Sequence, residues 1–215
     1  MWEQFERVIK KNGAILIFCQ TPYDKVIGMS NLKLLKYEWI WEKTEATGFL
    51  NANKMPLKAH ENILVFYQSL PFYNPQKTSH HNPAHNSRKY ATIINNSQIY
   101  GKLTKDIFNG GSTERYPRSI LTFQSDKQKN YILPTQKPVK LMEYFIKTYT
   151  AENKTVLDSF MGSGTVGIAC INTNRNFIGI EKDDNNYRLA KERITEKYNK
   201  IKYSLFDNIE YLQFD

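Results

Sequence analysis

The order of apolar and polar positions predicts that the first part of the chain alternates helices with strands. Apolar residues recur at helical spacing over Trp2–Lys10, and the continuous apolar run Ile15–Cys19 is typical of a strand buried on both faces. Aromatic and β-branched runs predict two further strands at Tyr37–Trp41 and Ile63–Tyr67. The basic stretch 48–60 between them has the composition of a loop. We therefore expect the chain to open as part of an α/β domain.

Regular periodicity returns at Pro134, after a long polar stretch. From there the pattern predicts a strict alternation of helices with strands, namely helix Pro138–Tyr149, strand Thr155–Phe160, helix Thr165–Asn172, strand Phe177–Ile180 and helix Asp184–Lys197. Strands joined through helices form parallel sheets with right-handed crossovers. This half of the chain therefore predicts a parallel sheet covered by helices.

Changes in composition divide the chain into four parts. Residues 1–68 and 131–200 carry the periodic segments, and we expect them to form one α/β domain. Residues 69–130 are rich in Asn, Ser, Thr, Lys, Tyr and Pro, which is typical of a long-looped insertion with a binding function. Residues 201–215 form a tail to which the pattern assigns no structure.

Cysteine and histidine usage predicts neither a disulfide nor a metal site. Cys19 and Cys170 both lie in apolar runs, which is typical of buried, reduced thiols in a cytoplasmic protein. His80, His81 and His85 have no cysteine or carboxylate cluster beside them, so no metal site is expected. No basic-then-apolar leader and no apolar run long enough for a membrane span occurs in the sequence.

The sharpest chemical signal is a strand that ends in a carboxylate and is followed by a glycine turn. The string 157–165 reads Leu-Asp-Ser-Phe-Met-Gly-Ser-Gly-Thr, and the next strand ends in Glu181. Glycines let a ligand approach the main chain closely, and the helix that follows offers unpaired N–H groups. An acidic residue at the tip of the second strand can accept hydrogen bonds from both ribose hydroxyls. The pattern predicts a nucleoside or dinucleotide site, against the alternative of a tight turn without a ligand.

Two cofactors fit this pattern. The glycines of 162–167 satisfy the G-x-G-x-x-G spacing of NAD-binding proteins, but no residue suited to hydride transfer stands out. The longer string 158–165 is more specific, and it resembles the cofactor motif of the S-adenosylmethionine-dependent DNA amino-methyltransferases. Ser159 stands where that family usually has proline. The approach to the second strand, 172–181, also resembles that family.

The resemblance implies a Rossmann-like methyltransferase sheet, mostly parallel and doubly wound, in which the cofactor motif follows the target-recognition segment. It implies a site-specific methyltransferase of the restriction-modification type, which transfers the methyl group of S-adenosylmethionine to an exocyclic base amine, with adenine N6 favoured over cytosine N4. The cofactor would be held by the glycine motif, by the second-strand carboxylate and by a segment beside its methionine end, which together comprise Thr135, Gln136, Lys137, Asp158, Phe160, Gly162, Ser163, Gly164, Thr165 and Glu181.

Further strings extend the resemblance over nearly the whole chain to about residue 198. Residues 39–43, 48–61 and 115–120 resemble a branch of these enzymes that is common in bacteria and their phages. The formal net charge of +9 and the pI near 9.3 indicate an anionic partner, and the resemblance implies double-stranded DNA. The candidate DNA contacts are Lys54, Arg88, Lys89, Arg115 and Arg118, although any single lysine in this region is more typical of a solvated surface.

The catalytic motif of that family, Asp-Pro-Pro-Tyr or a close variant, occurs nowhere in the sequence. We expect the chain to begin after the segment that carries it. The nearest string provides Gln20, Pro22 and Tyr23 as catalytic candidates, but its place after a buried strand favours an ordinary loop. Two interpretations stay open: an active enzyme, or a remnant or subunit that binds cofactor or DNA while a second chain or a homodimer completes the site.

In such a sheet the strand with the catalytic motif sits beside the glycine-motif strand. Removing a central strand leaves unpaired backbone groups on both neighbours. We expect one of three outcomes: Ile15–Cys19 closes onto Thr155–Ser159, another chain fills the gap, or the fold is poorly stable by itself.

Overall fold

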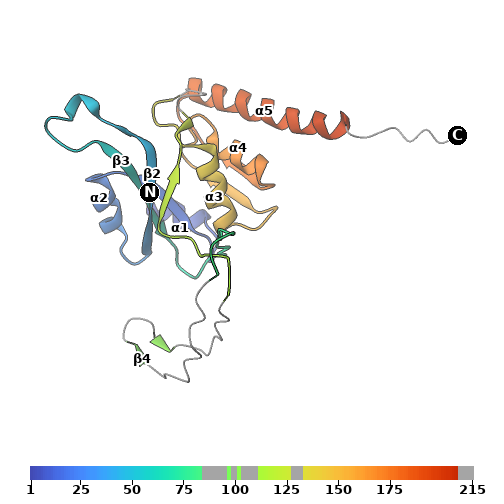
Figure 1. Ribbon diagram of the computed structural model, residues 1–215. Helices are drawn as coiled ribbons and strands as arrows, with labels where there is room; N and C mark the ends of the chain where they lie inside the picture. Colours follow the sequence, from blue (N-terminus) through green and yellow to red (C-terminus); the bar gives the residue numbers. More distant parts are fainter. Residues whose placement is uncertain (84–95, 98–100, 103–110, 127–132, 208–215) are drawn as a thin grey trace. The chain divides into compact units, whose positions relative to one another are not determined.

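The computed structural model describes residues 1–83, 96–97, 101–102, 111–126 and 133–207. The chain divides into two compact units, one formed by 1–74 and 118–215 and the other by 75–117 (Figure 1). In the smaller unit, Thr78 and Arg115 form a β-bridge, and Nζ of Lys77 lies 2.9 Å from Oε2 of Glu114. Two short antiparallel strands, β4 (Asn96–Ser97) and β5 (Gly101–Lys102), also belong to this unit.

A mixed four-stranded sheet forms one part of the larger unit. Its order is β1–β3–β2–β6, with bounds β1 Ile15–Cys19, β3 Lys58–Phe66, β2 Leu35–Thr47 and β6 Ile120–Phe123. Strands β1 and β2 run antiparallel to β3, and β6 runs parallel to β2. The carboxyl ends of β1, β2 and β6 therefore lie at the same edge of the sheet. The expected α/β class is confirmed, although this sheet is mixed and β6 was not expected.

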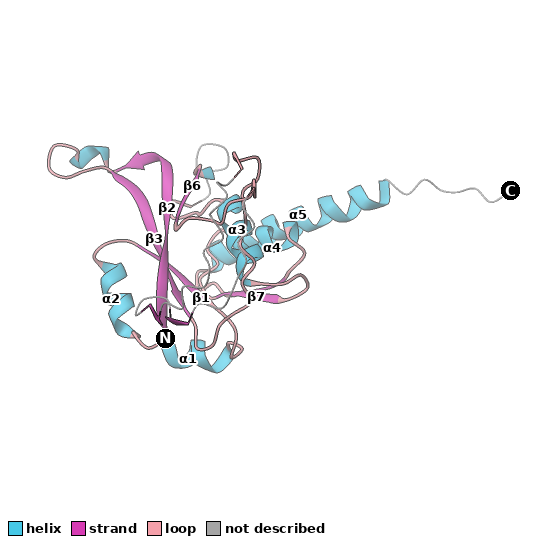
Figure 2. Ribbon diagram, turned by 60° about the horizontal axis from the view of Figure 1, so that its bottom comes forward, coloured by secondary structure: helices cyan, strands magenta, loops and turns pink. Residues whose placement is uncertain are grey.

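Strands β2 and β3 are longer than the sequence predicted, and they form a hairpin that projects from this edge (Figure 2). Residues 48–60 were expected to be a loop, but β2 continues to Thr47 and β3 already begins at Lys58. The pairing of Thr47 with Lys58 follows a register shift, so the strands meet again beyond an irregular stretch. A short 3-10 helix, η1 (Phe49–Asn51), forms the tip.

The glycine motif lies in a β-α-β unit, as expected. Strand β7 (Thr155–Asp158) pairs in parallel with β8 (Asn176–Gly179), and α4 (Thr165–Asn172) connects them. The first strand ends at Asp158 rather than at Phe160, because the Asp158 carboxylate accepts the N–H of Phe160 at 3.1 Å and turns the backbone away. Both carboxylates of the motif thus stand at strand ends.

The remaining helices are α1 Trp2–Val8, α2 Tyr23–Ser30, α3 Val139–Tyr149 and α5 Asp184–Asp207. Helix α2 was not expected, because a strand-end loop was assigned to its first turn. Helix α5 continues to Asp207 rather than ending at Lys197. No helix in the described ranges has the length and apolarity needed to cross a membrane.

Helix α3 packs between the sheet and α4 in the main core. Its buried residues Leu141 and Phe145 lie in one cluster with Trp39 and with Cys170 of α4. The hydroxyl of Tyr149 at its end accepts the indole N–H of Trp39 at 2.7 Å. This hydrogen bond satisfies a buried polar group inside the apolar cluster.

Strands β1 and β7 each have an unpaired edge. Among the described residues, β1 pairs with β3 alone and β7 with β8 alone, so the expected closure of Ile15–Cys19 onto Thr155–Ser159 does not occur. One face of the parallel pair is also uncovered, with Leu157, Ile178 and Ile180 exposed by 39%, 54% and 53%. Parallel strands are normally buried on both faces, so this pair is open along one edge and one face.

Candidate functional site

The glycine loop after β7 is built for close approach of a ligand to the backbone. Gly162 has φ +49, and a Cβ built there would meet no atom of the described chain closer than 3.6 Å. Gly164 has φ +74 and caps α4, and its N–H bonds the carbonyl of Met161 at 2.8 Å. A Cβ at Gly164 would lie 3.1 Å from Cβ of Ala190 on α5. The positive φ of Gly162 is a conformation that favours glycine, and Gly164 lets α5 pack against the loop.

Glu181 lies beside this loop at the end of β8. Its Oε2 accepts the N–H of Gly162 at 2.8 Å, and its Oε1 accepts the N–H groups of Lys182 and Asp183. The backbone N–H groups of Asp183 and Gly162 hold the pKa of this carboxyl below its ordinary value. Glu181 is therefore ionised at neutral pH, and its Oε2 atom keeps a lone pair for a further donor. Sequence and structure agree on its place next to the glycines.

Asp158 and Phe160 lie at the base of the same loop. Burial raises the pKa of the Asp158 carboxyl, and the nearby charge of Glu181 raises it further, while the Phe160 N–H lowers it. Two carboxyl groups held close at one site are a common feature of ligand-binding clefts. The Phe160 ring is 78% exposed, so its face is available for stacking.

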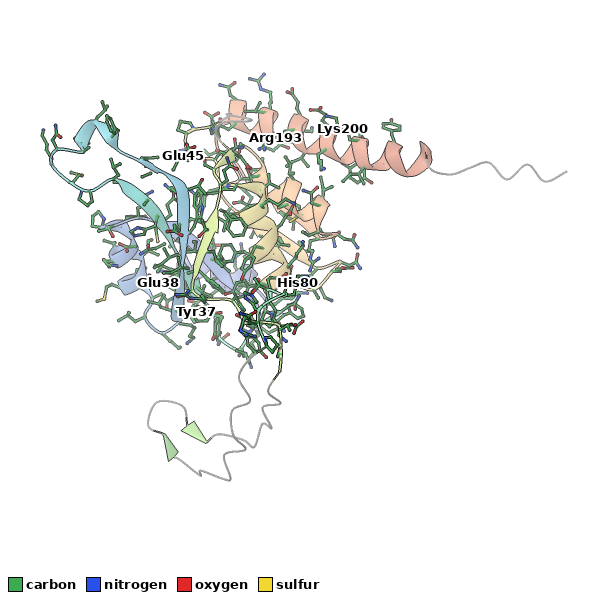
Figure 3. All side chains as sticks on the ribbon, viewed as in Figure 1. Tyr37, Glu38, Glu45, His80, Arg193 and Lys200 are labelled. Atoms are coloured by element: carbon green, nitrogen blue, oxygen red, sulfur yellow. The ribbon has the colours of Figure 1, made fainter. Side chains whose placement is uncertain are left out.

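Ser163 and Thr165 lie in the loop but are buried, with 4% and 5% exposure. Arg193 lies on α5 (Figure 3), and its guanidinium donates to the carbonyl oxygen of Ser163 at 2.8 Å. It also donates to the hydroxyl oxygens of Ser163 at 3.3 Å and of Thr165 at 3.4 Å. Their side chains thus fix the loop to α5 and offer a ligand only backbone groups. Sequence reasoning missed Arg193, which carries no local signal on a long polar helix.

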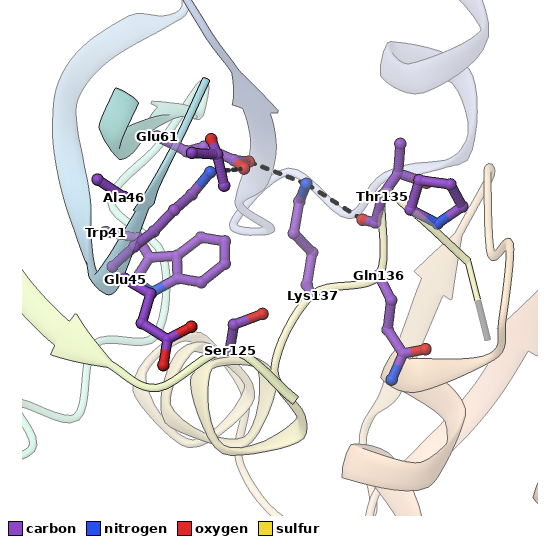
Figure 4. Close-up of a pocket in the computed structure, with 11 residues that line it drawn as sticks. Trp41, Glu45, Ala46, Glu61, Ser125, Thr135, Gln136 and Lys137 are labelled. Carbon is purple, nitrogen blue, oxygen red and sulfur yellow. Dashed lines mark hydrogen bonds and ion pairs between the residues drawn. The ribbon is translucent and has the colours of Figure 1, made fainter. Parts of the chain in front are cut away.

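The segment 133–138 ends where α3 begins and lines a cavity of about 110 Å³ with β2 (Figure 4). The other lining residues are contributed by β3, by Ser125 and by β2, from which Trp41, Lys43, Glu45, Ala46 and Thr47 line the cavity. The side chain of Gln136 is 5% exposed, and its Oε1 and Nε2 atoms have no hydrogen-bond partner among the described residues. An unsatisfied buried amide costs about 1–3 kcal/mol, which indicates a place for a polar ligand.

Lys137 reaches Glu61 at the wall of the same cavity. Its Nζ lies 2.9 Å from Oε2 of Glu61, 3.3 Å from the carbonyl oxygen of Thr135 and 5.9 Å from the centroid of the Phe18 ring. Lys43 lies 2.8 Å from the other oxygen of Glu61. Thr135 and Lys137 therefore belong to one polar cluster, to which the structure adds Glu61 and Lys43, whereas the Gln136 side chain points away from it (Figure 4).

The string Gln20–Tyr23 leads from β1 into α2. Pro22 precedes the first helical residue, and Tyr23 is 60% exposed. The carbonyl of Gln20 accepts the N–H of Asp24 at 3.0 Å, as in an ordinary helix start. Asp24, which sequence reasoning did not single out, is the buried group here, and it accepts a hydrogen bond from Asn62 at 2.9 Å.

The expected DNA-contacting residues fall into three groups. Lys54 is exposed near the tip of the β2–β3 hairpin. Arg115, in the smaller unit, donates to carbonyl oxygens of its own unit, including that of Ser112 at 2.7 Å, while Arg118 lies in the larger unit. Arg88 and Lys89 lie outside the described residues, as does His85. No group of three or more metal-ligating side chains occurs in the part of the chain that the structure describes.

Comparison with known proteins adds a family and several relatives. The family model described as DNA methylase, for N6 and N4 methyltransferases, matches residues 1–192. The Type II methyltransferase M.HpaI of Haemophilus parainfluenzae is 28% identical over 202 residues, 92% of this chain and 58% of its own length. M2.LlaDCHI of Lactococcus lactis subsp. cremoris is 36% identical over 45% of this chain and 32% of its own length. The chain thus spans between a third and three fifths of these relatives.

Solved structures have the same fold. The complex of M1.HpyAVI with S-adenosylmethionine superposes with a TM-score of 0.62 at 25% identity, covering 89% of this chain and 78% of that one. The cytosine-N4-specific PvuII DNA methyltransferase superposes with a TM-score of 0.60, covering 93% and 75%. Its identity of 16% means that this second likeness shows the fold alone.

Proposed function

Since the chain belongs to the N6/N4 DNA methylase family, we propose that it binds S-adenosylmethionine at the glycine loop and serves methyl transfer to an exocyclic amine of a DNA base. The observation that carries the proposal is the convergence of Asp158, Gly162 and Glu181 at the carboxyl ends of two parallel strands. Ligands of open α/β sheets bind at this edge. The cofactor complex of M1.HpyAVI supports the choice of cofactor.

The residues of the proposed site have separate tasks. Glu181, ionised and next to Gly162, accepts a ribose hydroxyl, and the exposed ring of Phe160 offers a face to the adenine. Gln136, through its unpaired amide, and Lys137, through its ammonium group, serve the amino-acid end of the cofactor. Bound S-adenosylmethionine would supply the electrophilic methyl group. Ser163, Gly164 and Thr165 fix the conformation of the glycine loop. Asp158 and Thr135 are the remaining residues that we assign to the cofactor site.

We propose double-stranded DNA as the partner and the β2–β3 hairpin as one of its contacts. The tip 48–58 contains Lys54 and Lys58 and no carboxylate, and its Phe49 and Leu50 are 80% and 99% exposed. Lysines suit phosphates, and exposed apolar side chains at a protruding tip suit contact with bases. Arg88, Lys89, Arg115 and Arg118 are proposed as further contacts. A bacterial or phage protein that acts on DNA in this way is expected in the cytoplasm.

A second proposal concerns the unpaired edges of β1 and β7. The sequence lacks Asp-Pro-Pro-Tyr, and both strands leave backbone groups unpaired in the described chain. We propose that a strand of another polypeptide segment, with the catalytic motif, pairs between them. On this alternative the chain is the cofactor- and DNA-binding part of a split methyltransferase. The uncovered side chains of Leu157 and Ile178 favour it, because they are apolar and exposed.

One experiment separates these proposals. The purified chain is incubated with methyl-labelled S-adenosylmethionine and unmethylated DNA, and the nucleosides are analysed by mass spectrometry. N6-methyladenine would support an active adenine methyltransferase and would return Gln20, Pro22 and Tyr23 to consideration as catalytic residues. N4-methylcytosine would instead identify cytosine as the target base. Cofactor binding without methyl transfer would support the split enzyme. A folded chain that binds no S-adenosylmethionine would contradict both.

A further inference from the structure

Two lysines from distant parts of the chain converge on one buried carboxylate. Glu61 on β3 is 8% exposed, and its two oxygens lie 2.8 Å from Nζ of Lys43 and 2.9 Å from Nζ of Lys137 (Figure 4). Lys43 lies on β2, and Lys137 lies in the segment that precedes α3. A single carboxylate therefore joins the base of the hairpin to the segment that we assign to the cofactor.

The register of the hairpin brings Lys43 to Glu61. Trp41 lies directly opposite Glu61 in the ladder, and Lys43, two residues further along, points to the same face. The ammonium of Lys43 also lies 5.3 Å from the centroid of the Trp41 ring. Lys43 is thus held by the strand to which it belongs, and its side chain is 9% exposed.

Lys137 has no comparable support from its own backbone. It lies between Gln136 and Pro138, in a stretch without helix or strand. Its four-carbon stem is flexible, so the carboxylate of Glu61 decides where its ammonium lies. Of the three ammonium donors, one faces Glu61 and one faces the carbonyl of Thr135 at 3.3 Å. One donor remains for a ligand in the cavity.

The charges of this cluster do not cancel. Two ammonium groups surround one carboxylate, and the lysines hold the pKa of Glu61 below its ordinary value even though burial raises it. These three side chains together carry one net positive charge at neutral pH, and the carboxylate of Glu45 also lines the cavity. The Gln136 amide, for which the described residues provide no partner, points away from the Lys137 ammonium group (Figure 4). An ammonium group with a donor to spare is suited to a ligand that carries a carboxylate.

We propose that Glu61 is a positioning residue that holds Lys137 where its ammonium group receives the α-carboxylate of S-adenosylmethionine. This inference rests on the proposed function, because it assigns the amino-acid end of the same cofactor to this cavity. Glu61 touches no reacting atom. It acts through Lys137, and Lys43 shares its negative charge so that the carboxylate stays ionised in a buried place.

The test compares two ligands that differ at the amino-acid end. 5′-Methylthioadenosine has the nucleoside of S-adenosylmethionine but lacks the carboxylate and the amine. Calorimetric dissociation constants for both are measured without DNA, for the wild-type chain and for Glu61→Gln. We expect Glu61→Gln to raise the dissociation constant of S-adenosylmethionine at least about tenfold, which is the effect of a lost charge-assisted hydrogen bond. The dissociation constant of 5′-methylthioadenosine should not change.

Matched variants keep the result interpretable. Glu143→Gln removes another buried carboxylate, which is 6% exposed and lies 3.1 Å from Nζ of Lys140, and should leave the ratio of the two constants unchanged. Lys137→Met should reproduce the selective loss, and it replaces Glu61→Gln as the test if circular dichroism shows that the latter is unfolded. An equal loss of affinity for both ligands, or no loss of affinity for either, would overturn the positioning role. A folded wild-type chain that binds neither ligand would instead overturn the proposed function.

Discussion

The Oε2 atom of Glu61 and the Nζ atom of Lys137 lie 2.9 Å apart, and the pair joins the two halves of the larger unit. Glu61 belongs to the hairpin whose tip we assign to DNA, and Lys137 belongs to the segment that we assign to the cofactor. Both residues also line the cavity between β2 and the segment that precedes α3. The two surfaces that we assign to DNA and to the cofactor are thus joined by one ion pair.

The first prediction concerns acid stability. The lysines hold the pKa of Glu61 below 4.5 in the folded chain, against the opposing effect of burial. A carboxyl with a lowered folded pKa stabilises the fold above its unfolded pKa, and this contribution is lost as pH falls through the folded value. Glu61→Gln should therefore lower the free energy of unfolding at pH 7 by up to about 3–5 kcal/mol. Its difference from wild type should shrink below pH 4.5.

Urea unfolding at pH 7 and below pH 4 measures this difference. Glu196→Gln is the control, because Glu196 pairs with Lys200 on the exposed face of α5. Its effect should be small at both pH values, because water and salt screen an exposed ion pair. A Glu61→Gln difference that is independent of pH would contradict the assignment.

The second prediction concerns the hydroxyl of Tyr149. It accepts the indole N–H of Trp39 at 2.7 Å and lies 2.9 Å from the hydroxyl of Tyr37. Tyr149→Phe leaves the buried indole N–H unpaired, so it should lower the free energy of unfolding by about 1–3 kcal/mol. Urea denaturation followed by tryptophan fluorescence measures the change. Tyr198→Phe on α5, where the ring is 57% exposed, should change stability by less than about 0.5 kcal/mol.

The third prediction concerns the two thiols. Burial raises the pKa of Cys19 to about 11 and that of Cys170 to about 12. Because the thiolate is the nucleophile, both thiols should react slowly with a disulfide reagent at pH 8 in the native chain. In denaturant both should react at once. Rapid native labelling of Cys170, which is 0% exposed, would show that the core opens at α4.

The fourth prediction concerns the hairpin tip. If Lys54 contacts a phosphate, Lys54→Ala should weaken binding to all DNA sequences alike and lower the slope of log affinity against log salt by about 1. Fluorescence anisotropy at several salt concentrations measures both quantities. Lys33→Ala is the control, because Lys33 is exposed just before the start of β2, at the opposite end of that strand from the tip. Equal effects of the two variants would argue against a specific role for the tip.

Local patterns predicted those parts of the fold in which neighbouring residues decide the structure. The strand of Asp158, the glycine loop and the start of α4 follow from one string, and Glu181 follows from the spacing of the next strand. The extension of β2 and β3 was missed because their outer residues are mostly polar. The pairings of Glu42 with His60 and of Thr47 with Lys58 make them strands.

Contacts between distant segments could not be predicted in the same way. Glu61 looks like one polar residue at the edge of an apolar strand, and only the register of β2 brings Lys43 to it. Arg193 likewise looks like one charge among many on α5, but it donates to Ser163. Of the three outcomes considered for the missing strand, the pairing of Ile15–Cys19 with the glycine-motif strand does not occur among the described residues, where β1 pairs with β3 and β7 pairs with β8.

The central claim is that the glycine loop and Glu181 bind S-adenosylmethionine, and isothermal titration of the folded chain tests it most directly. The wild-type chain should bind one equivalent of S-adenosylmethionine. Glu181→Ala, which removes the proposed ribose acceptor, should weaken binding at least about tenfold while its circular dichroism spectrum stays native. Equal affinity of the two folded proteins, or no heat of binding with the wild type, would contradict the claim.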